Sequence, residues 1–324
     1  MAHAIRFHQT GGPEVLRWET VDVGAPAAGE VSVRHHAVGL NYIDTYHRSG
    51  LYPVPLPSGL GLEGAGVVEA VGEGVTDFVP GDRVAYAGGP LGAYAEVRNL
   101  PAHRMVKLPA TLSFEQGAAV MLQGLTAQYL LRRTYRVQPG DTVLIHAAAG
   151  GVGLIACQWA KALGATVIGT VGSDAKAELA RAHGCDHPIV YTRENFTERV
   201  REITGGAGVP VVYDSIGKDT FMDSLRCLRP LGMMVLFGAA SGPVPPFDIN
   251  LLNTMGSLYL TRPGIVAYTA KREDLVTMAN ELFEVVESGK VRIEINQRYA
   301  LMDAAQAHRD LEARRTTGST ILLP

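Results

Sequence analysis

The segment from residue 142 to residue 163 constrains this chain more than any other. It begins with a β-branched and apolar run, Val143–Ile145, that predicts a buried parallel strand. Small residues then lead through Gly150 and Gly153 into residues 154–163, which carry apolar side chains at helical spacing. A strand, a small-residue turn and a helix are typical of a dinucleotide-binding loop, because backbone N–H groups at the helix start can hold a pyrophosphate.

The glycine pattern of this loop is imperfect. Ala148 stands where the first glycine of a G-x-G-x-x-G pattern belongs, and Gly150 and Gly153 supply the other two. An ordinary tight turn between a strand and a helix would use glycines as well, so the loop alone leaves both interpretations open. The alternation of strands and helices that follows favours the dinucleotide interpretation.

Length, charge and cysteine content exclude several classes of protein. A chain of 324 residues, 47% of them hydrophobic, is long enough for two ordinary domains. A formal net charge of -3 without a long basic run argues against a dedicated nucleic-acid binder. No signal peptide and no apolar run of membrane-spanning length are found, so we expect no membrane association. Three scattered cysteines, Cys157, Cys185 and Cys227, fit a reducing cytoplasm.

The first 125 residues read as short strands separated by glycine and proline turns. Val31–Val38 and Gly64–Gly72 are two of these predicted strands, and a Pro-Gly turn at residues 80–81 precedes a third. Many short strands at close spacing predict a small barrel-like β domain.

Polar residues gather at two places in this β-rich part. Asn41, Asp44 and Tyr46 fall in one cluster, and they could be turn or cap residues, which is the commoner role for Asn and Asp. Glu63 lies between glycines in the other cluster, where it could accept hydrogen bonds from backbone N–H groups. The same side chains could instead line a substrate site.

Several motifs along the chain resemble those of a known family. The motifs GDRV at 81–84, GAYAE at 92–96 and AAAGGVG at 147–153 resemble the medium-chain dehydrogenase/reductase superfamily. Within it, four further stretches resemble the zinc-independent NADPH:quinone oxidoreductases: GLNYIDTY at 39–46, RSGLYP at 48–53, GLTAQY at 124–129 and LTRP at 260–263. The resemblance covers the whole chain.

The resemblance implies an α/β fold of two domains. Residues 1–125 and 263–324 would form a discontinuous GroES-like β-barrel catalytic domain, and residues 126–262 a doubly wound Rossmann domain. The zinc-dependent relatives place a cysteine near Asn41 and a histidine before the residue matching Glu63. Here Leu62 precedes Glu63 and no cysteine occurs before Cys157, so the sequence predicts no metal site. Histidines such as His146 are expected at core edges or on the surface.

The nucleotide domain shows a regular alternation of elements. After the glycine turn we expect six strands in the order 3-2-1-4-5-6, with a dinucleotide at the switch point. The expected strands after Val143–Ile145 are 167–171, 188–191, 209–213, 233–237 and 257–260, and the expected helices are 175–182, 196–203 and 221–228. A capping box at Ser113 and Gln116 predicts the start of the preceding helix.

The end of the second strand indicates the cofactor. Enzymes that prefer NAD usually place an acid there for the ribose 2′-OH, but this strand ends without one. Gly172 and Ser173 leave room, and Lys176 could meet a 2′-phosphate, so NADPH is expected. Tyr191 matches a tyrosine that lies near this phosphate in the resembling family. Asp174 would repel a phosphate if it pointed inward, and we interpret it as a surface or cap residue of the following helix.

The resemblance implies further cofactor contacts. Arg314 matches an arginine that reaches the cofactor phosphate in relatives, although Arg315 beside it leaves that assignment uncertain by one position. The complete expected cofactor set is Asn41, Tyr42, Ile43, Asp44, Tyr46, Thr126, Tyr129, Gly150, Gly151, Val152, Gly153, Gly172, Ser173, Lys176, Tyr191, Gly238, Ser241, Arg262 and Arg314.

The last part of the chain is expected to return to the first domain. Its predicted elements are a long amphipathic helix over Arg272–Glu287, a strand over Val291–Ile295, a helix over Met302–Arg314 and a final strand over Thr320–Leu323.

The resemblance implies hydride transfer from NADPH to a quinone without a metal. Asn41, Tyr46, Tyr52 and Gln123 are the expected residues that line the substrate site and donate to its oxygen. A lysine replaces Gln123 in several relatives, which leaves the role of that residue open. Two alternatives stay open: a zinc-independent enone or alkenal reductase, and a catalytically silent, crystallin-like nucleotide-binding protein. A homodimer formed through the edge of the nucleotide domain is expected.

Overall fold

The computed structural model describes residues 1–324 and divides into two compact units. The first unit contains Met1–Leu125, Thr269–Glu287 and Ile293–Pro324, and the second contains Thr126–Tyr268 and Ser288–Arg292. The second boundary falls at residue 269, later than the expected 263, because Tyr268 belongs to the second unit. Its ring stacks on Tyr129 at 4.5 Å between centroids, and its hydroxyl lies 2.7 Å from that of Thr134.

The second unit is built on a six-stranded parallel sheet whose strand order confirms the sequence prediction. The order is β11-β10-β9-β12-β13-β14, which is 3-2-1-4-5-6 when the strands are counted along the chain. The bounds are β9 Thr142–Ile145, β10 Thr166–Val171, β11 His187–Val190, β12 Val209–Asp214, β13 Leu228–Leu236 and β14 Tyr259–Thr261. Strand β14 starts two residues later than expected, since Ser257 adopts a left-handed backbone conformation with φ 55°.

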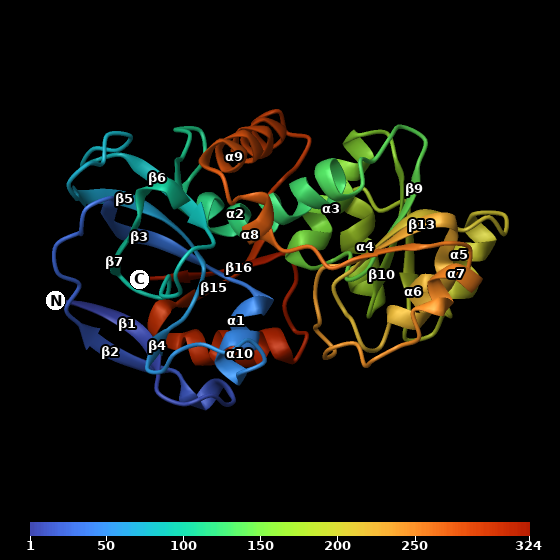
Figure 1. Cartoon of the computed structure of the whole chain (residues 1–324), viewed down its shortest axis with the longest axis horizontal. Helices are drawn as coiled ribbons and strands as arrows, with labels where there is room; N and C mark the ends of the chain where they lie inside the picture. Colours follow the sequence, from blue (N-terminus) through green and yellow to red (C-terminus); the bar gives the residue numbers. More distant parts are fainter. The chain divides into compact units, whose positions relative to one another are not determined.

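Helices connect the parallel strands and cover both faces of the sheet (Figure 1). Helices α3 and α4 pack together on one face, while α5 and α6 pack together on the other. Their bounds, with those of two shorter helices, are α3 Gly151–Ala162, α4 Asp174–Ala182, α5 Phe196–Ile203, α6 Phe221–Cys227, α7 Asn250–Thr254 and α8 Ile265–Tyr268. This arrangement brings the carboxyl ends of β9 and β10 to one edge, where the loops that follow them meet.

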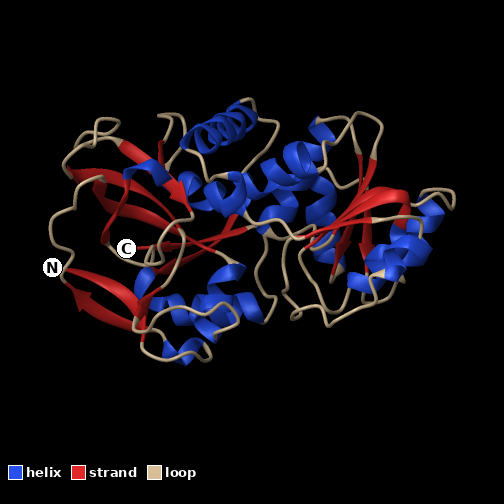
Figure 2. Cartoon of the chain, viewed as in Figure 1, coloured by secondary structure: helices blue, strands red, loops and turns tan.

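The first unit consists mainly of β-sheet (Figure 2). A seven-stranded sheet follows the order β15-β16-β3-β5-β6-β8, with β7 paired to β3, and a three-stranded sheet follows β2-β1-β4. The strands are β1 Ala2–Phe7, β2 Arg17–Val21, β3 Glu30–Leu40, β4 Ser58–Gly59, β5 Glu63–Val71, β6 Arg83–Ala87, β7 Val97–Pro101, β8 Met105–Lys107, β15 Ile295–Ala300 and β16 Ser319–Leu323. Its helices are α1 Tyr42–Ser49, α9 Arg272–Glu287 and α10 Ala304–Glu312, and α2 Phe114–Tyr129 runs from this unit into the second.

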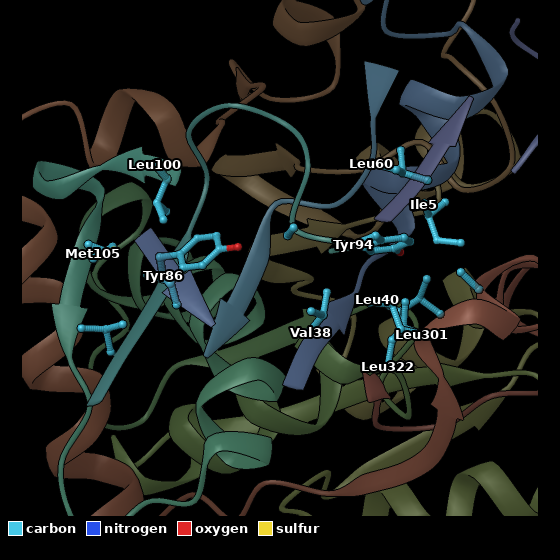
Figure 3. Packing of buried hydrophobic residues seen from close by; sticks show 14 of the residues in the cluster. Ile5, Val38, Leu40, Leu60, Tyr86, Tyr94, Leu100, Met105, Leu301 and Leu322 are labelled. Atoms are coloured by element: carbon cyan, nitrogen blue, oxygen red, sulfur yellow. The ribbon is translucent and has the colours of Figure 1, made fainter. Parts of the chain in front are cut away.

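One hydrophobic core joins distant parts of the first unit (Figure 3). Ile5 and Leu60 contribute from the start of the chain, and Leu301 and Leu322 from its end. The ring of Tyr94 lies among them and is fully buried. Because burial of each such side chain contributes about 1.5–3 kcal/mol, this core explains why the C-terminal segment returns to the first unit.

Besides the start of β14, three parts of the chain differ from the sequence prediction: strand β13 starts at Leu228 instead of residue 233, and α1 and β15 differ as follows. Residues 42–49 form a helix, α1, that the sequence pattern did not predict. Asn41 is its N-cap, and its C-cap is Gly50, which is left-handed with φ 85°. The strand expected at Val291–Ile295 is wrong over most of its length, since β15 starts only at Ile295. Residues 291–294 stay outside the sheet because the backbone of Arg292 is held by Gln158, with both bonds at 3.0 Å.

The capping box at the start of α2 is confirmed. The N–H of Ser113 donates to the side chain of Gln116 at 2.9 Å, and the N–H of Gln116 donates to the Ser113 hydroxyl at 3.1 Å. Because Ser113 is exposed, Ser113→Ala removes little besides this bond. We expect the free energy of unfolding, measured in urea, to fall by about 1 kcal/mol. Ser113→Asp, which can still cap the helix, should retain most of that stability.

Candidate active site

The glycine turn is shaped by close contacts within its own backbone. Ala147 is left-handed with φ 53°, and its carbonyl oxygen accepts from the N–H of Gly150 at 2.9 Å. A Cβ atom on Gly153 would lie 2.2 Å from that same oxygen, whereas a Cβ on Gly150 would lie 3.3 Å from it. Position 153 therefore requires glycine for packing. The first N–H groups of α3 have no partner inside the helix, so the turn fits a bound phosphate.

A buried polar cluster anchors this turn to the neighbouring strand. His146 directly precedes the turn, and its ring nitrogens lie 2.8 Å from the hydroxyl of Thr170 and 2.9 Å from that of Ser224. The Ser224 hydroxyl donates to Asp214 at 2.9 Å. The other oxygen of Asp214 accepts from two backbone N–H groups at 2.7 and 3.0 Å, which fixes the loop after β12. Sequence reasoning missed Asp214; its signal is an acid at the end of an otherwise apolar buried strand.

The loop after β10 holds the residues expected near a 2′-phosphate. Ser173 is the N-cap of α4 and accepts from the N–H of Lys176 at 3.4 Å. A Cβ on Gly172 would lie 2.9 Å from the hydroxyl of Tyr191, so the tyrosine oxygen lies directly over the glycine. Asp174 is the first residue of α4 and is exposed, in agreement with its interpretation as a surface residue at the helix start.

Two further expected cofactor residues follow β13. A Cβ on Gly238 would lie 2.5 Å from the carbonyl oxygen of Ser215, so the two backbones approach as closely as glycine allows. The hydroxyl of Ser241 donates to the carbonyl of Ile216 at 2.9 Å and thereby holds the same loop. Arg262, at the end of β14, donates to the carbonyl of Leu236 at 3.1 Å.

Thr126 and Tyr129 lie on the part of α2 that belongs to the second unit. Both side chains are buried, and burial raises the pKa of the Tyr129 hydroxyl to about 12. With its ring stacked on Tyr268, Tyr129 is a fixed neutral phenol. It can donate or accept a hydrogen bond at neutral pH but cannot supply charge.

In the first unit, Asn41 and Gln123 belong to one buried chain of hydrogen bonds. The Ser319 hydroxyl lies 2.7 Å from the Gln123 carbonyl oxygen, and the Gln123 amide nitrogen lies 3.2 Å from the Asn41 oxygen. The Asn41 amide nitrogen lies 2.6 Å from a carboxyl oxygen of Glu63, whose other oxygen accepts from the N–H of Leu122 at 2.7 Å. Gln123 thus holds Asn41 in place, which is a positioning role.

Glu63 is the titratable group at the end of this chain of hydrogen bonds. It is fully buried, and burial raises the pKa of its carboxyl from 4.5 to about 8, against the opposing effect of the bonds from Asn41 and Leu122. The possibility that Glu63 accepts backbone hydrogen bonds is confirmed by the bond from Leu122. A group with this pKa exchanges a proton near neutral pH, next to the amide of Asn41.

A second chain of buried hydrogen bonds fixes α1 to α10, the C-terminal helix. The N–H of Asn41 donates to the Asp44 carboxylate at 2.9 Å, and the Tyr94 hydroxyl donates to the same oxygen at 2.8 Å. His308 lies 3.2 Å from that hydroxyl and 2.8 Å from Arg48, which also forms two bonds to Glu312 of α10 at 2.6 and 3.1 Å. The carboxylate of Asp44 is thus a structural cap inside the unit, as the commoner role of Asp predicts.

The expected tyrosines gather on and after α1. The rings of Tyr42 and Tyr46 meet edge to face at 5.6 Å, and those of Tyr46 and Tyr52 at 5.2 Å. The N–H of Tyr52 donates to the carbonyl of Tyr46 at 3.0 Å, which fixes the loop after the helix. Ile43 lies between Tyr42 and Asp44 in the same first turn.

The C-terminal arginines can be distinguished. Arg315 pairs with Asp310 of α10 at 2.9 Å. Arg314, just after the helix, has a left-handed backbone with φ 58°, and its charge acts on the hydroxyl of Tyr42. Arg314 therefore stays the residue expected to reach the cofactor.

No group of three or more His, Cys, Asp or Glu side chains is arranged to hold a metal ion. The carboxyl oxygens of Glu63 accept from the Asn41 amide and from the N–H of Leu122. No helix is long and apolar enough to cross a membrane.

Comparison with known proteins establishes the family. An alcohol dehydrogenase GroES-like domain family matches residues 27–110, and a zinc-binding dehydrogenase family matches residues 151–283. The chain is 59% identical to a quinone oxidoreductase of Pseudomonas aeruginosa over the full length of both proteins. It belongs to the quinone oxidoreductase family of the medium-chain dehydrogenases/reductases. A quinone oxidoreductase of Escherichia coli solved in complex with NADPH has 52% identity and a TM-score of 0.98, with both chains covered completely.

Family membership confirms the expected fold class, a GroES-like domain with a Rossmann domain, and the enzyme class, oxidoreductase. A 2-haloacrylate reductase of Burkholderia is also similar, at 48% identity over 100% of this chain and 99% of that protein. The quinone oxidoreductase family therefore has a relative named for reduction of an activated alkene.

Proposed function

We propose that this protein is a metal-independent NADPH:quinone oxidoreductase. The observation that carries the proposal is the pair of loops after β9 and β10. In the first, a turn that requires glycine at position 153 leads into a helix N-terminus, and in the second, Ser173 and Lys176 lie where an acid would be expected in an NAD site. Such loops suit a pyrophosphate and a 2′-phosphate. The names of the most similar relatives, and the NADPH complex of one of them, support the same activity.

The proposed cofactor set is the one expected from the sequence. Two residues take a positioning role: Gln123 of the expected substrate set positions Asn41, and one carboxyl oxygen of Asp44 positions α1 by accepting from Asn41 and Tyr94. Thr126 and Tyr129 are assigned to the nicotinamide end, and Arg314 is assigned to a phosphate.

NADPH, when bound, supplies the hydride. The protein must bind the quinone, keep water away and meet the negative charge that develops on the substrate oxygen. Asn41 is held by Gln123 and Glu63 and still has a second amide N–H to donate, and Tyr46 and Tyr52 provide phenol groups on a fixed aromatic cluster. None of the three is an obligatory general acid, because reduction of a quinone already gives an aromatic product.

The decisive experiment compares substrates under single-turnover conditions. Stopped-flow oxidation of NADPH should be followed with 1,4-benzoquinone, naphthoquinones, simple enones and 2-haloacrylates, each with and without a metal chelator. We expect rapid turnover of quinones that the chelator does not change. Faster turnover of the alkenes would favour the alternative that the 2-haloacrylate reductase relative represents. Binding of NADPH without turnover of any substrate would instead indicate a crystallin-like role.

Tyr46→Phe is expected to reduce kcat by about tenfold or less and to weaken NADPH binding by no more than about tenfold, because Tyr46 also belongs to the proposed cofactor set. The substitution removes a hydroxyl but keeps the ring that packs between Tyr42 and Tyr52. Steady-state kinetics and isothermal titration of the cofactor measure the two quantities. A complete loss of turnover with intact cofactor binding would contradict the assignment, because Tyr46 would then be an essential proton donor.

We also infer a cytoplasmic homodimer that pairs through β14. This strand lies at the edge of the parallel sheet, and Tyr259 on it is 58% exposed, an unusual state for a large aromatic side chain. Sedimentation equilibrium of Tyr259→Glu should show dissociation into monomers.

A further inference from the structure

Asp174 carries a negative charge beside the proposed 2′-phosphate site, and an arginine neutralises it. Both terminal nitrogens of Arg193 bond to the two carboxylate oxygens of Asp174, at 2.5 and 2.7 Å. The pair is exposed, with 57% of the arginine side chain and 72% of the aspartate side chain accessible. The bonds from Arg193 lower the pKa of Asp174, so the carboxylate stays ionised at neutral pH.

The two partners come from neighbouring strand ends. Asp174 follows β10 by three residues and Arg193 follows β11 by three residues, and Val171 pairs with Val190 at the ends of these parallel strands. Tyr191, whose hydroxyl lies over Gly172, is two residues before Arg193. The ion pair therefore lies on the same loop cluster as the residues proposed for the 2′-phosphate.

Stability does not explain this pair well. An exposed ion pair contributes little to the folded state, because water and salt screen it. Arg199 and Glu194 form a separate pair in the next loop at 3.3 Å, and Arg181 and Glu178 form another on α4 at 2.5 Å, so neither arginine compensates Asp174. Without Arg193, the carboxylate would lose the bidentate partner that holds it in place.

We propose that Arg193 determines cofactor specificity by neutralising Asp174, which would otherwise repel the 2′-phosphate of NADPH. The inference rests on the proposed function. The 2′-phosphate is close to a dianion at neutral pH, whereas NADH presents a hydroxyl at that position. An uncompensated carboxylate therefore disfavours NADPH and leaves NADH almost unaffected, or favours it through a hydrogen bond to the hydroxyl. Arg193 acts through Asp174 rather than by contact with the phosphate.

The test is a double-mutant cycle on cofactor binding. Dissociation constants of NADP+, NAD+ and the fragment 2′,5′-ADP are measured by isothermal titration for the wild type, Arg193→Gln, Asp174→Asn and the double variant. Arg193→Gln should weaken binding of NADP+ and 2′,5′-ADP by about fivefold, the order expected for one exposed charge acting on a dianion, and change NAD+ by less than about twofold. In the Asp174→Asn background the same substitution should have a clearly smaller effect, because no carboxylate is then released toward the phosphate and only the screened charge of the arginine itself is lost.

Arg181→Gln is the matched control. It removes one exposed arginine from an ion pair on α4, at the end of the helix away from Ser173, and should leave all three affinities unchanged. The fivefold effect of Arg193→Gln should also shrink when the titration is repeated at high salt.

Each other outcome overturns the proposal. Equal weakening of NADP+ by Arg193→Gln in both backgrounds would show that Arg193 acts on the phosphate by its own charge and not through Asp174. Equal weakening of NADP+ and NAD+ binding would show that the Asp174–Arg193 ion pair maintains the shape of the loop and does not select the cofactor. A wild type that prefers NADP+ and keeps that preference in Arg193→Gln would refute the role of Arg193 alone. A wild type without that preference would refute the cofactor assignment of the proposed function as well.

Discussion

Gly153→Ala is expected to lower the free energy of unfolding by about 3 kcal/mol and to weaken NADP+ binding by more than about a hundredfold. The added Cβ would lie 2.2 Å from the carbonyl oxygen of Ala147 and 2.8 Å from two backbone atoms of Ala148. All three contacts are to main-chain atoms, so no side chain can move aside. Either the start of α3 or the turn itself must shift, and both carry the N–H groups that would bind the pyrophosphate.

Gly150→Ala tests how closely the cofactor approaches the turn, because it lacks the packing clash expected of Gly153→Ala. Its Cβ would lie 3.3 Å from the same carbonyl oxygen, a contact that a small adjustment relieves. Its backbone φ of -81° also suits alanine, so we expect unfolding in urea to change by less than about 1 kcal/mol. Any loss of NADP+ affinity in Gly150→Ala then measures how closely the cofactor approaches this residue. Wild-type stability in Gly153→Ala would contradict the packing argument.

Features that depend on local sequence could be predicted well. The glycine turn, the six strands and the capping box at Ser113 each follow from residues a few positions apart, and the order of the parallel strands then follows from general rules of connection. The different packing at Gly153 and Gly150 is a finding of the structure, and it agrees with the general role of the third glycine of such a loop in packing helix on strand.

Features that depend on distant pairing could not be predicted. The bond between Gln123 and Ser319 joins residues 196 positions apart, and it exists because β16 pairs with β3 next to α2. For the same reason, the hydrogen bond between Gln123 and Asn41 could not be read from residues that lie 82 positions apart. Helix α1 was missed because its eight residues are too few to show a clear period, and its stability comes from Arg48 and its bonds to α10.

Glu63→Gln is expected to make the protein less sensitive to alkaline pH. The folded-state pKa of Glu63, about 8, lies above the ordinary value of 4.5, so the folded protein keeps a proton that the unfolded chain has released. Stability from this group is complete below about pH 4.5 and is lost as the pH rises to about 8. Between about pH 6.5 and pH 8.5 the wild type should lose about 2 kcal/mol more than the variant, as measured by urea unfolding.

Other titratable groups set this pH window. Burial raises the pKa of Asp44 to about 7, so it contributes in the same direction in both proteins. Burial lowers the pKa of His35 to about 4 and that of His308 to about 3. These two histidines therefore change the stability only at pH values below 6.5, outside the window of the experiment. Glu115→Gln is the control, since Glu115 is exposed and bonded to Arg298; its pH dependence should match the wild type.

The variant is expected to fold because the buried hydrogen-bond chain can reverse its direction. An amide at position 63 can accept from Leu122 with its oxygen and donate to Asn41, provided that the Asn41 amide turns over. The amide of Gln123 then turns as well, and the Ser319 hydroxyl donates to the carbonyl of Ala119, which lies 3.1 Å away. The reversal costs the bond that the Asn41 side chain accepts from the N–H of Asp44, but that N–H keeps its bond to the Asn41 carbonyl at 3.0 Å. The same holds when Glu63 of the wild type is protonated. Parallel pH profiles for the wild type and Glu63→Gln would show that the carboxyl is ionised throughout.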